Sequence, residues 1–216
     1  MKKISIVFAT TSEFKRKEIA VVLSNCEFKD ADNVVRKVSD RFDIPFSDVR
    51  TDEPLEIDLV AMVRHKAVSA YRGLLMPCMV EHAGLILKEH QRTGFPGGLT
   101  QPTWDALGAE GFLRRTRSAG EHAIARAVFG YCDGMSVSTF VGETEGLIAS
   151  EPRGSRHFYW DTIFCPLEFQ NKTYAEISDD PSRGIREKMK VSQSFKALRT
   201  LLELRVRRGE AELFSS

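Results

Sequence analysis

The N-terminal part of the chain alternates short apolar runs with segments in which apolar residues recur at helical spacing. Residues 3–9 are dense in β-branched and apolar side chains, and three hydroxyl residues, 10–12, follow them. This order predicts a strand, a polar turn and a helix that runs to about residue 23. Between residues 54 and 71 apolar side chains return every three or four positions, which predicts a second helix.

The middle of the chain changes to the period of strands. Residues 79–87 are expected to form a strand broken by Gly84, and residues 94–100 (GFPGGLT) a loop, because glycine and proline interrupt them. Helical segments are expected at residues 104–115 and 121–124.

Residues 126–150 are expected to form a meander of short strands. The three expected strands cover residues 127–131, 136–141 and 144–149, with turns at Asp133-Gly134 and Gly142-Glu143. A last helix is expected at residues 192–204, before a polar tail at 205–216. Together these elements predict an α/β fold with one domain over residues 1–204.

Composition narrows the class of protein. A chain of 216 residues can bury a sizeable core, and 31 Lys and Arg against 30 Asp and Glu leave no charge excess for sequence-independent binding of nucleic acid or anionic membrane. We therefore expect neither partner, and no stretch approaches the roughly 18–20 apolar residues of a membrane span. The four cysteines contain no CxxC pair, which argues against zinc and disulfides and favours buried thiols in a reducing cytoplasm.

A first candidate site lies where the first strand meets the first helix. Backbone N–H groups at a helix start, the hydroxyls of Thr10 and Ser12, and Lys15 one turn later together suit phosphate oxygens. Helix capping also explains the hydroxyls, but it does not explain Lys15.

Glu81 and His82 place an acid and an imidazole side by side on the expected strand 79–87. Adjacent residues of a strand point to opposite faces, so at most one of the two should face a given pocket unless Gly84 or a bulge redirects the chain. The alternative interpretation is an edge strand with exposed polar residues.

Two later segments carry candidates for binding a nucleobase. Phe158 and Trp160 precede Asp161, and aromatic faces stack on bases while a carboxylate accepts hydrogen bonds from ring N–H groups. An aromatic core patch is the alternative, although a buried Asp161 needs a partner. The lysine-rich run that begins at Lys188 is usually a solvated surface, and spacing alone does not decide whether it belongs to a site.

In this order the motifs resemble those of the inosine triphosphate pyrophosphatase (ITPase) family. The family's opening A-T-x-N-x-x-K-x-x-E is matched at Ala9, Thr10, Lys15 and Glu18, with Ser12 at the asparagine. The family's lysine in a run like E-K-A is matched by Lys66, and its V-E-D-T/S-G-L strand by Val80-Glu81 and Gly84-Leu85. Its G-x-P-G loop is matched at Gly94, Pro96 and Gly97, and its G-x-x-E-G turn at residues 142–146. Its F-x-W-D is matched at Phe158, Trp160 and Asp161. The likeness runs from about residue 3 to residue 204.

The resemblance implies an elongated α/β fold in which a central mixed sheet with flanking helices forms two lobes around a cleft, usually as a homodimer. It also implies Mg²⁺-assisted attack of water on the α-phosphate of a nonstandard purine nucleoside triphosphate, giving the monophosphate and pyrophosphate. By position, the triphosphate would be bound by Thr10, Ser12, Lys15 and Lys66. The base would be bound by Phe158, Trp160, Asp161, Lys188, Gln193 and Ser194.

The chain also departs from the family pattern. His82 stands where the family has an aspartate proposed to handle the metal or the attacking water; a neutral imidazole is a poor Mg²⁺ ligand but can act as a base near neutral pH. Gln193 and Ser194 replace a histidine and an arginine that read the purine carbonyl. The family's metal-binding glutamate has no clear match, so we predict Asp48, together with Glu81, as metal ligands.

Three functional hypotheses follow. In the favoured one, the protein keeps its phosphate and base-stacking residues but has lost catalytic ones, and it acts as a catalytically weakened nucleotide sensor or regulatory subunit. It would report a nucleotide such as dITP to an effector protein in a hetero-complex, for instance within an antiviral defence operon. In the second, it is a working pyrophosphatase with His82 as base and Glu81 and Asp48 on Mg²⁺. The third is a scaffold that binds no nucleotide, and it would be favoured if Lys15, Lys66 and Phe158 did not converge on one cleft.

Overall fold

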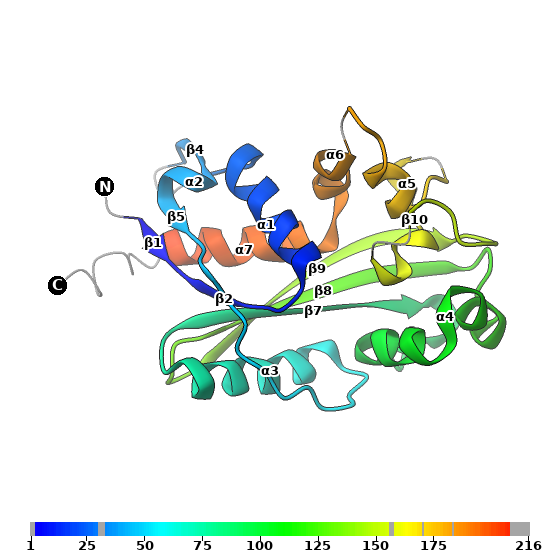
Figure 1. The fold of residues 1–216 in the computed structure, drawn as a ribbon, viewed down its shortest axis with the longest axis horizontal. Coiled ribbons are helices and arrows are strands. Elements are labelled where there is room, and N and C mark those ends of the chain that lie inside the picture. Colours follow the sequence, from blue (N-terminus) through cyan, green and yellow to red (C-terminus); the bar gives the residue numbers. More distant parts are fainter. Residues whose placement is uncertain (1–2, 30–32, 156–157, 170, 183, 208–216) are drawn as a thin grey trace.

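A six-stranded mixed sheet runs through the computed structural model, which describes residues 3–29, 33–155, 158–169, 171–182 and 184–207 (Figure 1). In spatial order its strands are β10 (Phe164–Pro166), β9 (Val137–Ile148), β8 (His122–Cys132), β7 (Cys78–Leu87), β2 (Val7–Ala9) and β6 (Phe46–Ser47). The four strands from β10 to β7 pair antiparallel, whereas β2 pairs parallel with both β7 and β6. This confirms the mixed α/β sheet with flanking helices.

Helices cover both faces of the long strands (Figure 1). One face carries α3 (Leu59–Leu74) and α4 (Thr100–Thr116), and the other carries α1 (Glu13–Asn25) and α7 (Gln193–Arg207). The shorter helices are α2 (Val38–Arg41), α5 (Tyr174–Ser178) and α6 (Gly184–Val191). Two small sheets pair β1 (Ile4–Ser5) with β5 (Phe42–Asp43) and β3 (Glu27–Lys29) with β4 (Val35–Lys37). None of the helices in the described ranges is long and apolar enough to cross a membrane.

The N-terminal predictions are confirmed with small changes of boundary. The strand expected at residues 3–9 is present as β1 and β2, and α1 follows it with Ser12 as its N-cap. The second helix begins at Leu59 because the Asp58 carboxylate accepts a hydrogen bond from the backbone N–H of Val60 (2.8 Å) and caps it there.

Several predictions for the middle of the chain were wrong. Strand β7 runs unbroken through Gly84, and β8 begins at His122, where a helix was expected. The expected meander of three strands is two long strands, because β9 continues through Gly142 instead of turning there. A Cβ atom at Gly84 would collide with the carbonyl oxygen of Gly97, and one at Gly142 with that of Gln193. Both glycines therefore permit close packing within or upon the sheet.

The prediction of buried thiols is confirmed for three of the four cysteines, and the last helix runs slightly past its predicted end. All four cysteines are free; Cys78, Cys132 and Cys165 are buried and Cys26 is partly buried. Helix α7 extends to Arg207, so residues 205–207 belong to the helix and not to the predicted tail. The rest of that tail lies outside the described residues.

Candidate functional site

A cleft of about 580 Å³ opens between the start of α1, helix α3 and strand β7. The predicted site residues that line it are Thr10, Ser12, Lys15, Lys66, His82, Phe158 and Trp160. Seven residues from four separate parts of the chain thus meet at one cavity. Lys15, Lys66 and Phe158 therefore do converge, so the observation that would have favoured the scaffold hypothesis is not made.

The hydroxyls at the start of α1 hold the turn in place. The Ser12 hydroxyl accepts a hydrogen bond from the backbone N–H of Lys15 (3.4 Å), and the Thr10 hydroxyl accepts one from the backbone N–H of Ser12 (3.2 Å). These are capping contacts, as the alternative interpretation expected. The same turn directs the Lys15 side chain along the cleft.

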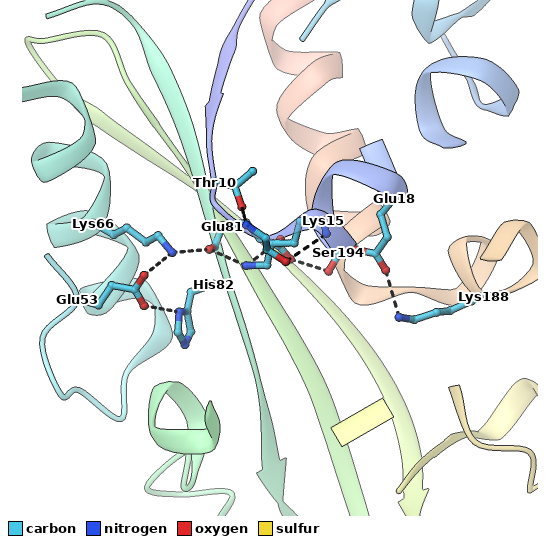
Figure 2. Close-up of polar contacts among 10 residues, drawn as sticks. Thr10, Lys15, Glu18, Glu53, Lys66, Glu81, His82, Lys188 and Ser194 are labelled. Carbon is cyan, nitrogen blue, oxygen red and sulfur yellow. Dashed lines mark hydrogen bonds and ion pairs between the residues drawn. The ribbon is translucent and has the colours of Figure 1, made fainter. Parts of the chain in front are cut away.

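Lys15 and Lys66 converge on a single atom, although they come from α1 and α3 (Figure 2). Their ammonium groups donate to the backbone carbonyl oxygen of Glu81 at 3.1 and 3.2 Å. Burial lowers the pKa of Lys66, and the positive charge of Lys15 lowers it further. Two ammonium groups held this close make a site of positive potential suited to a polyphosphate.

Glu81 and His82 point to opposite faces of β7, as their alternation on the strand predicted. His82 lines the cleft. The Glu81 carboxylate lies on the other side, where it is 3 % exposed, pairs with Lys15 (3.3 Å) and accepts a hydrogen bond from the Ser194 hydroxyl (2.7 Å). Glu81 is therefore engaged in holding Lys15 and is not among the residues lining the cleft.

Glu53 is the one carboxylate among the described residues that line the cleft, and sequence reasoning missed it, as it missed Arg50, Gln101 and Tyr159. The Glu53 carboxylate lies 2.6 Å from the Lys66 ammonium and 3.2 Å from Nδ1 of His82 (Figure 2). Burial opposes its ionisation, but the hydrogen bond from His82 and the charge of Lys66 outweigh this effect and lower the pKa of Glu53. It belongs to a loop rich in acids and proline without periodicity, and its only sequence signal is its position before the helix that carries Lys66.

The surroundings of His82 favour its neutral form. Burial lowers its pKa, and the ammonium groups of Lys15 and Lys66 lower it further against the opposing effect of Glu53. Because Glu53 accepts the hydrogen bond at Nδ1, the proton of the neutral ring lies there. Nε2 is then an acceptor, and it is buried without a hydrogen-bond partner among the described residues.

Asp48 lies away from this arrangement. Its side chain is 76 % exposed, forms an ion pair with Arg16 and is not among the residues that line the cleft. The prediction of Asp48 as a metal ligand is corrected accordingly: the carboxylate that faces the cleft is Glu53. The two residues are five positions apart in an irregular segment, where no periodicity indicates which acid turns inward.

A buried charged cluster lies beside the aromatic residue Phe158, and its members Lys188, Asp161 and Glu18 are not among the residues that line the cleft. Lys188 is 2 % exposed and lies 2.6 Å from Asp161 and 3.1 Å from Glu18. Burial opposes the charge of Lys188, but the two carboxylates outweigh it and raise its pKa. Burial also raises the pKa of Asp161, and it raises that of Glu18 to about 7. Phe14 and Phe158 stack beside this cluster with ring centroids 4.5 Å apart.

Gln193 and Ser194 do not line the cleft. The Gln193 side-chain oxygen accepts a hydrogen bond from the Tyr174 hydroxyl (3.0 Å), and the Ser194 hydroxyl donates to Glu81. Both residues are buried, and the contacts of their side chains tie α7 to neighbouring elements. Their predicted role in base binding therefore has no support from this geometry.

The stretch of the chain that forms this cleft matches a known family model. The model of the Ham1 family matches residues 6–204. The chain belongs to the Ham1 family. This confirms the resemblance inferred from the motifs.

Relatives within the Ham1 family cover most of the chain. It is 34 % identical over 166 residues to a dITP/XTP pyrophosphatase of Methanopyrus kandleri, covering 76 % of this chain and 81 % of that protein. A dITP/XTP pyrophosphatase of Hyperthermus butylicus is 30 % identical over 197 residues, covering 91 % and 92 %. The solved structure of a HAM1 protein from Coxiella burnetii superimposes with a TM-score of 0.67 at 21 % identity, covering 93 % and 98 %, and shows the shared fold.

Proposed function

We propose that the protein binds a noncanonical purine nucleoside triphosphate of the ITP, dITP and XTP class in this cleft and hydrolyses it to the monophosphate and pyrophosphate. The observation that carries the proposal is the convergence of Lys15 and Lys66 on one carbonyl oxygen, in the same cavity as His82 and Phe158. The dITP/XTP pyrophosphatases among the relatives support it.

His82 is the base in this proposal, with Glu53 holding it in place. A neutral imidazole whose Nδ1–H donates to a carboxylate presents Nε2 as proton acceptor. Nε2 takes a proton from water as the water oxygen bonds to the α-phosphorus. The bond from that phosphorus to the oxygen bridging to the β-phosphate breaks, and this oxygen leaves on pyrophosphate. Lys15 and Lys66 offset the charge of the triphosphate.

The residues present fit a Mg²⁺ ion that arrives with the nucleotide. Mg²⁺ is usually held by one or two carboxylates plus substrate phosphates, and Glu53 supplies one ionised carboxylate at the cleft. In the described ranges no group of three or more His, Cys, Asp or Glu side chains forms a metal site of its own. Bound there, Mg²⁺ would neutralise phosphate charge.

Nucleotide sensing is the second candidate. His82 occupies the position of the family's aspartate, Glu53 already pairs with two nitrogen atoms, and Glu81 faces away from the cleft. Such a protein would bind the nucleotide without turnover and pass the signal on, in the cytoplasm, to an effector protein in a hetero-complex or across a homodimer.

The two candidates differ in pyrophosphate release. Purified protein is incubated with Mg²⁺ and ITP, dITP, XTP or an ordinary triphosphate, and binding is measured separately by calorimetry. We expect turnover of the noncanonical purines at about 1 s⁻¹ or more. Tight binding of ITP with no pyrophosphate released would instead establish the sensor, and no binding at all would overturn both.

Lys15→Ala is expected to weaken ITP binding by about tenfold or more, because a charge-assisted contact to phosphate is lost. Calorimetry measures this. Lys17→Ala serves as the control: it changes the same charge on α1, but Lys17 is exposed and does not line the cleft. Equal affinities in both variants would show that the triphosphate lies elsewhere.

A further inference from the structure

Phe14 stacks on Phe158, which lines the cleft. The two rings are nearly parallel, at 19°, with centroids 4.5 Å apart. Phe14 belongs to the first turn of α1, and Phe158 precedes the short 3-10 helix Tyr159–Thr162. They come from elements far apart in the sequence, and both rings are only partly buried.

The Lys188 ammonium lies beside this stack. It is 4.4 Å from the centroid of Phe14 and 5.5 Å from that of Phe158. Were it beyond the outer face of Phe14, its distance to Phe158 would approach the sum of the Phe14 distance and the ring spacing. The ammonium therefore faces the gap between the two rings.

The carboxylate that binds this ammonium has one oxygen without a hydrogen-bond partner among the described residues. Asp161 binds Lys188 through Oδ2, while its Oδ1 is buried and has no hydrogen-bond partner among the described residues. Asp161 is only 2 % exposed, so this oxygen is costly unless a ligand donates to it. An ammonium donor and a carboxylate acceptor thus lie together at the edge of the stack.

We propose that Phe14 is the second wall of the base site, so that the purine inserts between Phe14 and Phe158; this rests on the proposed nucleotide binding. Without nucleotide, Phe14 takes the place of the base against Phe158. Carbon atoms in contact lie about 3.5 Å apart, so an inserted base needs rings about 7 Å apart. From the present spacing of 4.5 Å, the two rings separate by about 2.5 Å when the base enters.

The resemblance to the ITPase family already implies that Lys188 and Asp161 bind the base, and the second wall would hold a 6-oxopurine against them. Such a base presents a carbonyl acceptor next to a ring N–H donor, which matches the Lys188 ammonium beside Asp161 Oδ1. Adenine presents an amino donor next to a ring-nitrogen acceptor, the reverse of this order. Stacking between the rings supplies affinity, and this edge supplies discrimination.

The test compares ligands with and without a base. Phe14→Ala is expected to weaken ITP binding by about ten- to a hundredfold, the range for loss of one base-stacking ring. Binding of inorganic tripolyphosphate, measured by the same calorimetry, should not change. Phe14→Leu keeps apolar volume and should weaken ITP as much as alanine does, whereas Phe14→Trp should retain affinity and show quenching of its fluorescence when ITP binds.

Each outcome decides between the proposals. If Phe14→Ala binds ITP as tightly as the unaltered protein or more tightly, Phe14 does not stack on the base, and the proposal that it forms the second wall is wrong. The proposed nucleotide binding is not affected by that result. Parallel losses for ITP and tripolyphosphate would overturn the second wall too, since the substitution would then disturb the phosphate site. If the unaltered protein binds tripolyphosphate but not ITP, or binds neither, the proposed function and the second wall both fail.

Discussion

Replacing His82 with alanine is expected to lower kcat for pyrophosphate release from ITP by about 10² to 10⁴, the usual cost of losing a general base. Affinity for ITP should change little, because Lys15, Lys66 and Phe158 remain. His82→Asp, which restores an acid at this position, should retain turnover. His65→Ala is the matched control, because His65 is exposed on α3 and does not line the cleft.

The pH profile separates a base from a structural histidine. The base works only when neutral, so the rate should fall as pH drops through the pKa of His82, which burial places below its ordinary value of 6.5. Glu53 raises that pKa, whereas Lys15 and Lys66 lower it. Glu53→Gln should therefore move the acid limb to still lower pH. An acid limb that stays in place in Glu53→Gln and in His82→Asp would show that another group sets it.

The sequence predicted elements well where local chemistry decides them. The hydroxyls before α1 and the apolar spacing of α3 act within one or two turns, so their signals are readable without a partner. Gly142 shows the opposite case. A Gly-Glu pair is typical of a turn, but here the glycine makes room for the carbonyl of Gln193 on α7, a contact invisible in a local window.

Some residues of the candidate site could also be predicted from local sequence, whereas others depend on contacts that only the fold makes. Lys15, Lys66, His82 and Phe158 were predicted from motifs, and the structure brings them to one cleft. Glu53 was missed because it acts through side chains of α3 and β7 that only the fold brings near it. Gln193 and Ser194 were placed at the base because position in a motif does not tell which way a buried side chain points.

Phe14 shows a second reason why the sequence alone does not reveal some residues of the site. In the sequence it stands inside the phosphate motif, between Ser12 and Lys15, and nothing local suggests contact with an aromatic 144 positions later. The first turn of α1 directs Lys15 to the carbonyl oxygen of Glu81 and Phe14 to the ring of Phe158. One turn of helix thus contributes to both halves of the proposed ligand site.

Lys188→Met is expected to reduce the free energy of unfolding by about 3–5 kcal/mol, because it leaves buried Asp161 and Glu18 without their shared cation. Denaturant unfolding measures this. Lys190→Met is the matched control on the same helix: Lys190 is 66 % exposed, and its pair with Glu187 should be worth less than about 1 kcal/mol.

The loss of unfolding free energy in Lys188→Met should depend on pH. Without the ammonium, the folded-state pKa values of Asp161 and Glu18 lie further above their unfolded values of about 4. An acid whose pKa is raised on folding stabilises the protein below its unfolded pKa and loses that contribution as pH rises through the folded one. The gap between Lys188→Met and the unaltered protein should therefore be small near pH 4 and widen to pH 7 and above. Adding Asp161→Asn and Glu18→Gln should recover part of the loss at pH 7, because the unpaired charges are gone. A gap independent of pH, or no gap, would show that Lys188 stabilises the protein through packing alone.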